Sequence, residues 1–200
     1  MKAKLKIPDK HKERLYPAVL GLFSDKDFHQ VNMRAISRRS GVSIGTIYRY
    51  FSSKEDLLFS ILAEKIEAIG ALVGAHVQGL GSFKEIFRKV MWITMNYYDQ
   101  NPGVAITAFI TVPIRTWMQQ PGYRMEKQVF ADLVAQGRFL GGLDETIDLR
   151  RFQDIYYMIC YRCIHSWYFF GRKWKLVDAV ARDFDLWWKL LAPPRRGQGD

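Results

Sequence analysis

Residues 32–58, NMRAISRRSGVSIGTIYRYFSSKEDLL, decide the fold of this chain. Asn32 and Ser43 each precede a short run with helical periodicity, and the side-chain oxygen of either residue can cap a helix. Gly41 lies between the two runs, and glycine reaches the left-handed conformation that a sharp helix end requires. Ser53 is a third cap, because an acidic residue follows three positions later. The pattern predicts two short helices, a tight turn and a longer helix directly behind them.

The second short helix has an inward and an outward face. Ile47 and Phe51 stand one turn apart and face the first helix, which turns Ile36 toward them. Two helices joined in this way form a helix-turn-helix, whose second helix enters the major groove of DNA. The outward face carries Ile44, Thr46, Tyr48, Arg49 and Tyr50.

Residues 23–58, FSDKDFHQVNMRAISRRSGVSIGTIYRYFSSKEDLL, resemble the amino-terminal DNA-binding domain of the TetR family of bacterial repressors. The most specific part is GVSIGTIYRYFSSKEDL, which is similar to the family pattern G-V-S-x-G-T-[LI]-Y-x-[YH]-F-x-[ST]-K-x-x-L. The chain departs from the family where Ile44 replaces a frequent Lys or Arg, Ser37 a usual Ala and Asp27 a usual Gly. Ile44 favours an apolar contact with a thymine methyl, so the departures affect the expected operator and not the fold.

The expected DNA contacts follow from the helix faces and from this resemblance. Side chains near the start of the second helix would face bases, while cations and hydroxyls around it would hold phosphates, which fix the register without reading sequence. Gly45 lies on the same edge of the helix. We expect Ser43, Ile44 and Thr46 at the bases and Arg34, Tyr48, Arg49, Tyr50 and Lys54 at the phosphates.

The positive charge is concentrated in the part that resembles a DNA reader. The formal net charge is +10. Residues 1–54 hold 12 Lys or Arg against 4 Asp or Glu, a net charge of +8, and residues 55–200 hold 18 against 16, a net charge of +2. Neutralisation of phosphates would therefore drive binding to double-stranded DNA. No signal peptide opens the chain and the apolar run at residues 155–170 is too short to span a membrane, so we expect a cytoplasmic protein.

The rest of the chain has helical periodicity throughout, which predicts an all-α protein with two domains. Residues 1–54 would form the helix-turn-helix domain, and residues 55–200 a larger helical domain for effector binding and dimerisation. A helix from about 53 to 78 would connect them as a lever. Pro17, inside the first predicted helix, favours a kink or a start near Tyr16, because proline removes an amide donor.

Aromatic side chains are frequent beyond position 90 and exceed what filling a small helical bundle requires. Core packing explains most single positions, but together they would suit a pocket for a hydrophobic or aromatic effector. The run HSWYFFGRK at residues 165–173 is similar, with shorter spacing, to an H-x-x-x-W-x-x-x-G-[RK] trend in TetR-like regulators that bind acyl-CoA, which slightly favours fatty-acid or acyl-CoA effectors. The candidate ligand residues are Trp92, Tyr97, Phe109, Arg115, Trp117, Phe130, Tyr157, Tyr161 and His165.

The last two predicted helices favour a homodimer. Residues 152–167 and 177–191 repeat apolar residues at steps of three and four, and the first of these helices is apolar nearly all round, so it must be covered on more than one side. The resemblance implies that the two helices form a four-helix dimer interface, which would place two reading helices on a pseudo-palindromic site. The candidate interface residues are Tyr156, Cys160, Cys163, Trp167, Phe184, Trp187 and Trp188.

The sequence offers little chemistry beyond binding. It contains no HExxH, no glycine-rich phosphate loop and no nucleophile elbow, so we expect no enzyme activity, no metal and no cofactor. Cys160 and Cys163 form a C-x-x-C on a buried stripe, which favours inert core thiols. A redox or metal sensor acting through these cysteines, or a small-molecule-binding module without DNA binding, is the alternative to a ligand-responsive repressor.

Overall fold

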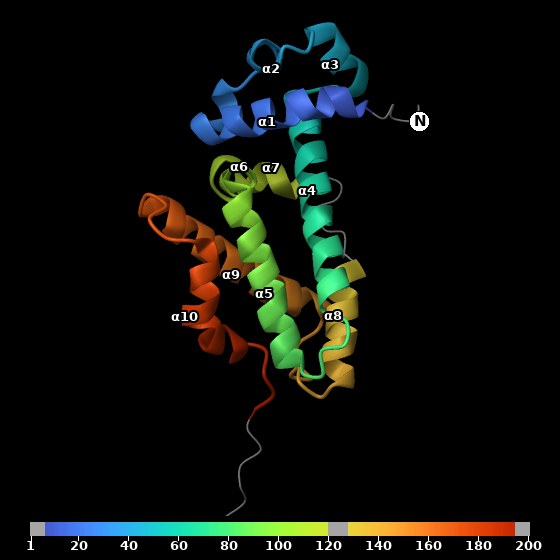
Figure 1. The fold of residues 1–200 in the computed structure, drawn as a ribbon, viewed down its shortest axis with the longest axis vertical. Coiled ribbons are helices and arrows are strands. Elements are labelled where there is room, and N and C mark those ends of the chain that lie inside the picture. The colour runs from blue at the N-terminus through green and yellow to red at the C-terminus, as the bar shows by residue number, and fades with distance from the viewer. Residues whose placement is uncertain (1–6, 120–127, 195–200) are drawn as a thin grey trace, which may run out of the picture. The chain divides into compact units, whose positions relative to one another are not determined.

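The computed structural model describes residues 7–119 and 128–194, and these residues form helices and no strand (Figure 1). The all-helical fold class predicted from the sequence is confirmed. Helical periodicity also predicts a helix over residues 123–139, of which the structure describes residues 128–139. The helices are α1 (Asp9–Asp25), the 3-10 turn η1 (Phe28–Gln30), α2 (Met33–Ser40), α3 (Ile44–Tyr50), α4 (Lys54–His76), α5 (Phe83–Gln100), α6 (Pro102–Ile106), the π-helical turn η2 (Thr107–Thr111), α7 (Ile114–Met118), α8 (Gln128–Phe139), α9 (Leu149–Phe169) and α10 (Leu176–Trp188).

Packing divides the chain into two compact units. Unit 1 comprises Met1–Glu67 and Asn101–Gln119, and unit 2 comprises Ala68–Gln100 and Gln120–Asp200. Helix α4 therefore begins in unit 1 and ends in unit 2. The sequence predicts a division at residue 54, which would assign Asn101–Gln119 to the second domain. In the structure, packing groups Asn101–Gln119 with α1, α2 and α3.

Helix α1 is continuous from Asp9 to Asp25 although Pro17 lies inside it. The predicted start near Tyr16 is therefore wrong. Pro17 is exposed, whereas Leu15 and Phe23 have no exposed surface. Burial of the apolar face stabilises the whole helix and offsets the hydrogen bond that the proline cannot donate.

Unit 1 buries one core between its reading helices and α1. Ile36 of α2 and Ile47 of α3 are fully buried, as the spacing predicts. The segment after Asn101 packs on α1 through Gly103, where an added Cβ would lie 3.5 Å from the Cβ of Leu20. The core of this unit therefore combines the first residues of the chain with a segment far along it.

A polar contact ties α1 to α4 within unit 1. The Lys12 ammonium and the Tyr16 hydroxyl both donate to Oε2 of Glu64, over 2.8 and 3.0 Å. Partial burial alone would raise the pKa of Glu64, but the hydrogen bonds from Lys12 and Tyr16 lower it below its usual value. Burial and the same carboxylate raise the pKa of Tyr16, so the phenol stays protonated and remains a donor.

Unit 2 has a core of phenylalanines. Phe83, Phe87 and Phe152 have almost no exposed surface, and Phe152 lies 6.2 and 6.0 Å from the other two ring centroids. Gly137 allows the close approach of α8, because a Cβ at this position would lie 2.8 Å from the Phe83 ring. Helix α10 packs against α5 and α9 around this core.

The amino-terminus of α10 is held by a residue of α5. The Asp99 carboxylate accepts hydrogen bonds from the backbone N–H groups of Leu176 and Val177, over 2.7 and 2.9 Å. These two amides are among the first of α10, which have no partner within the helix. Asp99 therefore fixes where α10 begins, and it does so from a distant part of the sequence.

Candidate DNA-binding site

The two short helices begin and end at the predicted caps. The Asn32 side chain accepts from the N–H of Ala35, and the Ser43 hydroxyl accepts from the N–H of Thr46, over 2.9 and 3.1 Å. Gly41 has a left-handed φ of 65° and its N–H donates to the Ser37 carbonyl. A side chain at Gly41 would be strained, and Arg14 of α1 donates to the Gly41 carbonyl over 3.1 Å, so the turn is held both by its own glycine and by α1.

Helix α3 buries one face and exposes the other. Ile47 is fully buried and Phe51, which follows the helix, is buried as well. On the other side, Ile44 and Tyr48 keep 37% and 52% of their surface exposed, which is unusual for large apolar side chains. Arg49 is also exposed. The outward edge predicted from the sequence is therefore accessible in unit 1.

The hydroxyls at the start of α3 are fixed by one another. Oγ of Ser43 and Oγ1 of Thr46 lie 2.8 Å apart, and either atom can be the donor. Their positions are set by the cap, because the same Ser43 oxygen accepts the Thr46 amide. A partner in front of this edge would meet two pre-positioned hydroxyls, each with capacity for a further hydrogen bond.

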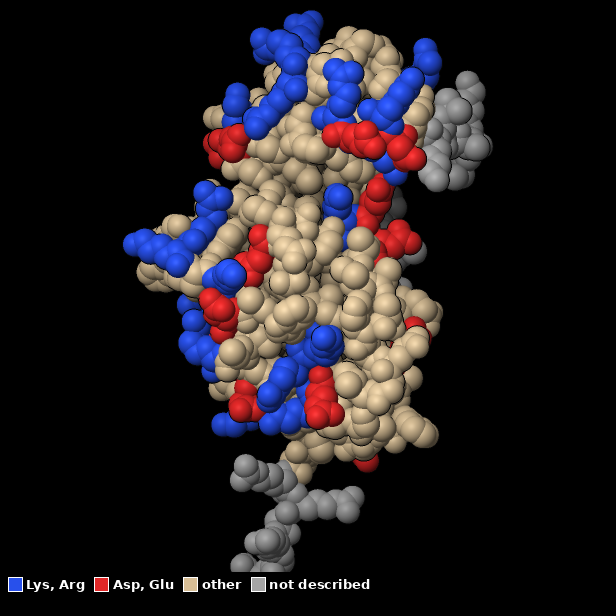
Figure 2. Space-filling model, in the orientation of Figure 1, with Lys and Arg blue, Asp and Glu red and all other residues tan. Residues whose placement is uncertain are grey.

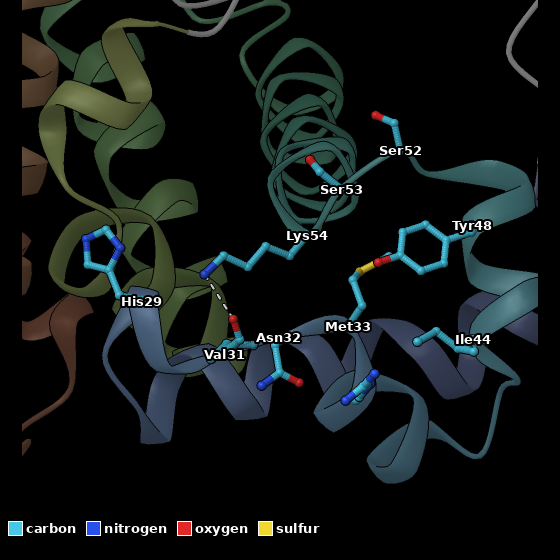
Figure 3. Close-up of a pocket in the computed structure, with 10 residues that line it drawn as sticks. His29, Val31, Asn32, Met33, Ile44, Tyr48, Ser52, Ser53 and Lys54 are labelled. Carbon is cyan, nitrogen blue, oxygen red and sulfur yellow. Dashed lines mark hydrogen bonds between the residues drawn. The ribbon is translucent and has the colours of Figure 1, made fainter.

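A hollow of about 700 Å³ opens beside α3 (Figure 3). Ile44 and Tyr48 border it from α3, and Asn32 and Met33 border it from the start of α2, as Figure 3 shows. Polar groups suited to an anion surround it. Its complete lining is His29, Val31, Asn32, Met33, Arg34, Ile44, Tyr48, Ser52, Ser53 and Lys54.

Lys54 has a structural role in this hollow. Its ammonium donates to the carbonyls of Phe28 and Val31, over 2.7 and 2.9 Å, and lies 4.7 Å from the centre of the Phe28 ring. The side chain is only 17% exposed. Two of its three N–H donors therefore hold the turn before α2, which leaves one for the phosphate contact that the sequence predicts.

Positive charge gathers on this part of unit 1. Figure 2 shows several Lys and Arg side chains at the end formed by α1, α2 and α3. Arg39 is paired with Asp25 at 3.1 Å. Arg34 and Arg38 are exposed, and within the described part of the chain they form no ion pair. Their charge is therefore available to an outside anion.

These features together define a helix-turn-helix DNA-binding domain. A capped reading helix presents polar and basic side chains next to an anion-suited hollow, which is the arrangement that a major groove requires. Among the described residues, no helix is long and apolar enough to cross a membrane.

Comparisons with known proteins agree with this class. Residues 18–61 match the model of the bacterial regulatory proteins of the tetR family. The chain is 45% identical over 58 residues to the HTH-type transcriptional repressor KstR of Rhodococcus jostii, an alignment that covers 29% of this chain and 27% of that protein. It is 22% identical over 185 residues to the HTH-type transcriptional regulator HbdR of an Aromatoleum species, which covers 86% of this chain and 74% of that protein.

Among solved structures, the fold is similar to the transcriptional regulator FadR from Bacillus subtilis in complex with stearoyl-CoA. The TM-score is 0.76 with 19% sequence identity, over 88% of this chain and 96% of that one. Residues 18–61 thus resemble the DNA-binding part of the tetR family, and the similarity of the remaining residues to solved structures is one of fold. The resemblance predicted from the sequence is therefore confirmed.

The predicted ligand residues are divided between the two compact units. Unit 1 contains Phe109, Arg115 and Trp117, and unit 2 contains the others. The ring of Phe130 is buried and lies 5.8 Å from that of Tyr157, and the rings of Tyr161 and His165 stack at 3.9 Å.

The other members of the predicted ligand set have different surroundings. Trp92 is exposed on α5 with the Lys89 ammonium 5.2 Å from its ring centre. Trp117 donates to the Ala108 carbonyl over 3.0 Å. A shared ligand pocket for the predicted set stays a prediction.

Most of the predicted dimer residues pack inside their own chain. Phe184 and Trp187 are buried, the hydroxyl of Tyr156 lies 2.8 Å from that of Thr94, and the indole of Trp167 donates to the Trp174 carbonyl. These residues leave little surface for a second copy. The apolar side chains of α9 and α10 that stay exposed are Tyr157, Met158, Tyr161, Tyr168, Phe169 and Leu186, and Leu190 follows α10.

The two cysteines have the surroundings of core thiols. Cys160 is fully buried and Cys163 is partly buried, and both thiols are free. Burial raises the pKa of Cys160 well above its usual value and that of Cys163 to about 11. Since the thiolate is the reactive form, the sensor alternative is not favoured. Among the described residues, no three His, Cys, Asp or Glu side chains are placed to hold a metal ion.

The sequence analysis missed the residues that border the hollow from outside α3. His29, Ser52 and Ser53 line it, and Asn32 does so in addition to capping α2. The spacing of the caps predicted where the helices start, but which loop residues meet in space depends on how α2, α3 and α4 pack. Asp99 was missed for the same reason, because its partners lie far away in the sequence.

Proposed function

We propose that this protein is a ligand-responsive repressor that binds a pseudo-palindromic operator as a homodimer. The observation that carries the proposal is the exposed edge of α3, where Ile44 and Tyr48 stand free beside a hollow lined by cations and hydroxyls. Large apolar side chains that stay exposed on a rigidly capped helix leave apolar surface in contact with water, and a partner that covers them gains free energy by removing that surface from water. Double-stranded DNA has the shape and charge to do so.

The residues of this edge take two roles in the proposal. Ser43, Ile44 and Thr46, with the backbone of Gly45, face base edges, and Ile44 contacts a thymine methyl. Side chains around them hold the phosphates of the strand that crosses the hollow and fix the register. The phosphate-holding residues are Arg34, Tyr48, Arg49, Tyr50 and Lys54.

Binding to DNA upstream of the protein's own gene tests the proposal. Fluorescence anisotropy with a labelled duplex should give saturable binding that weakens steeply with salt, because each phosphate contact changes the logarithmic salt slope by about 0.9. A random duplex of equal length should bind more weakly. Equal binding of both duplexes, or none of either, would contradict a sequence-specific regulator.

Replacing Tyr48 by Ala tests the phosphate assignment. We expect at least about a tenfold loss of affinity for every duplex, since a hydrogen bond to an anion is lost in each half-site. Phe139→Ala, at an aromatic residue of unit 2 that is 88% exposed, is the control and should bind as the parent does. Changing Ile44 to Lys should instead alter which sequence is preferred. Unchanged affinity of Tyr48→Ala would remove the phosphate role.

We further propose that the exposed stripe of α9 and α10 is where two copies meet. Met158 and Tyr161 lie three residues apart on α9, and Leu186 of α10, which is 66% exposed, lies four residues before Leu190, which follows the helix. Met158 and Tyr161 therefore share an exposed face of α9, and Leu186 and Leu190 add exposed apolar surface besides the faces in the core. A second copy that presents the same stripe would cover both.

The oligomeric state of a double variant tests this interface. Leu186→Asp with Leu190→Asp should convert a dimer into a monomer in sedimentation equilibrium, because four charges would be buried in the contact. Leu72→Asp, at an exposed leucine of α4, is the control and should leave the dimer intact. A double variant that stays dimeric would place the interface elsewhere.

For the effector we propose a hydrophobic ligand, with acyl-CoA as the first class to test. Support comes from the run at residues 165–173 and from the similarity in fold to FadR, whose structure contains stearoyl-CoA. The effector would change the arrangement of α4, which begins beside α3 and continues into unit 2, and would thereby lower the affinity for DNA. This requires that the effector binds the released arrangement more tightly.

Titration of the protein–DNA complex tests the effector class. Stearoyl-CoA should release the duplex and raise the thermal unfolding temperature of the free protein. Coenzyme A alone tests whether the nucleotide part is recognised, and stearate alone tests whether the acyl chain is recognised. If none of the three ligands releases the duplex or changes the thermal unfolding temperature, acyl-CoA is excluded as the effector.

A further inference from the structure

A second hollow, of about 550 Å³, lies between α2 and α3 on the same side of unit 1. Arg34, Ser37, Arg38 and Ile44 line it. Arg34 and Ile44 also line the larger hollow, so these two residues border both. Arg38 borders the second hollow only, and neither the family pattern nor the charge of the chain singles it out from its neighbours.

Three arginines of α2 have different surroundings. Arg39 forms an ion pair with Asp25, and its guanidinium lies against Gly21 of α1, so it serves the packing of unit 1. Arg34 and Arg38 lie one helical turn apart, both exposed, and in the described part of the chain no carboxylate pairs with them. A partner that offers hydrogen-bond acceptors or negative charge would therefore meet guanidinium groups whose charge is not already neutralised by a carboxylate.

The two free arginines differ in what surrounds them. The larger hollow places Arg34 with Tyr48, Ser53 and Lys54, which are groups that suit phosphate oxygens. The second hollow places Arg38 with Ile44 and without any of those groups. Ile44 is the first residue of α3, and the first residues of a reading helix are the ones that reach base edges. Arg38 thus lies beside the base-reading end of α3, whereas Arg34 borders both hollows.

We infer that Arg38 reads a guanine in the major groove, next to the thymine that Ile44 contacts. The guanidinium presents two parallel N–H groups, which match the O6 and N7 acceptors of guanine, and no other base offers this pair of acceptors. The adjacent apolar side chain of Ile44 restricts water around the contact and strengthens it. The inference rests on the proposed function and adds a base to the operator half-site.

Selection of binding sites from random duplexes is the first test. The parent protein should select a half-site with a guanine next to a thymine. Arg38→Ala should lose the guanine preference by at least about tenfold and keep the thymine preference, because one good bidentate contact discriminates by about that factor. Arg39→Ala, at the neighbouring paired arginine, is the matched control and should select the same half-site as the parent.

A modified base separates base reading from phosphate binding. Replacing the selected guanine by 7-deazaguanine removes the N7 acceptor and leaves the phosphates unchanged. The parent should lose affinity for this duplex by about tenfold, and Arg38→Ala should bind both duplexes equally. Arg38→Lys should recover part of the preference, since lysine can also donate to these acceptors.

Two outcomes would overturn the inference. In the first, Arg38→Ala weakens binding to all duplexes alike and reduces the salt slope, which would make Arg38 a phosphate contact. In the second, Arg38→Ala selects the same guanine as the parent, which would assign this base to another residue. Both outcomes leave the proposed function intact, whereas a parent protein that selects no sequence would contradict the proposed function itself. Circular dichroism and thermal unfolding confirm that each variant is folded, as expected for an exposed side chain.

Discussion

Helix α3 of the reader and helix α10 of unit 2 are both short and amphipathic, but their positions are fixed by different means. Helix α3 is capped by Ser43, the residue directly before it, and the preceding turn is set by Gly41. Helix α10 receives two hydrogen bonds at its start from Asp99, which is 77 and 78 residues away. The comparison teaches that a local cap can be identified from the sequence around a helix, whereas a cap supplied by a distant residue cannot, even where apolar periodicity locates the helix itself.

The largest expected effect lies in the core on which α10 depends. Phe184→Ala removes a buried ring that lies 5.9 Å from Phe87, and we expect it to cost about 3–5 kcal/mol of stability. Phe139→Ala removes the same side chain from a position that is 88% exposed, and should change stability by about 0.5 kcal/mol or less. Urea unfolding measures both. Similar losses in the two variants would mean that α10 is not held by its own core.

The distant cap should be the next most sensitive feature. Asp99→Ala leaves the amides of Leu176 and Val177 without their acceptor, so we expect a loss of about 2 kcal/mol. Asp99→Asn keeps one acceptor oxygen and should lose about half as much. Hydrogen exchange of these two amides, followed by mass spectrometry or NMR, should become faster in Asp99→Ala before any other part of unit 2 responds. Unchanged exchange would show that α10 begins without this contact.

The local cap of α2 should matter less. Asn32→Ala removes the acceptor for the Ala35 amide and should cost about 1 kcal/mol, while Asn32→Ser, which keeps an oxygen at the cap, should cost a few tenths. Thermal unfolding of the two variants checks the difference. Equal destabilisation by Ala and Ser would mean that the side-chain bond contributes nothing and that packing alone starts the helix.

The smallest expected effect is the pH-dependent contact between α1 and α4. The pKa of Glu64 is lowered in the folded protein, so the carboxylate stabilises the fold above the pKa of the unfolded chain, near 4.5, and loses this contribution as the pH falls through the lower folded value. Glu64→Gln should therefore be less stable than the parent at neutral pH, by under about 1 kcal/mol because the group is 47% exposed.

Unfolding midpoints of the parent and of Glu64→Gln, compared at neutral pH and at progressively lower pH, test the direction of this effect. The gap between the two proteins should narrow as the pH drops below about 4.5. A gap that widens on acidification would reverse the sign and contradict the assignment of Glu64 as the group that titrates.

The sequence predicted the reader in detail because its determinants are neighbours in the chain. The caps Asn32, Ser43 and Ser53 and the turn at Gly41 are where the pattern predicts them. The predicted late start of α1 near Tyr16 was wrong because the cost of Pro17 was weighed without the burial of Leu15 and Phe23 that offsets it. Local sequence rules predict how much free energy a residue such as proline costs in a helix. The stabilisation that burial of the helix face provides depends on tertiary packing.

Periodicity also has a limit in the last two helices. It correctly identified apolar stripes on α9 and α10, but it could not say which stripe faces the chain's own core. Trp167 and Phe184 are buried in that core, while Met158 and Leu186 remain exposed. Both sets repeat every three or four residues, so a one-dimensional pattern cannot separate a core face from a face that a second copy would cover.

The sequence by itself determined the resemblance of its amino-terminal part to the TetR family, the all-helical class and the reading helix with its outward edge. These features depend on backbone conformation and on hydrogen bonds between residues a few positions apart, which each local stretch specifies. The tertiary structure decided that the segment after Asn101 joins unit 1, that Lys54 holds the turn before α2, and that Arg38 shares a hollow with Ile44 while Arg39 does not. Such facts depend on which distant side chains meet when apolar surface is buried, and that is settled by the packing of the whole chain.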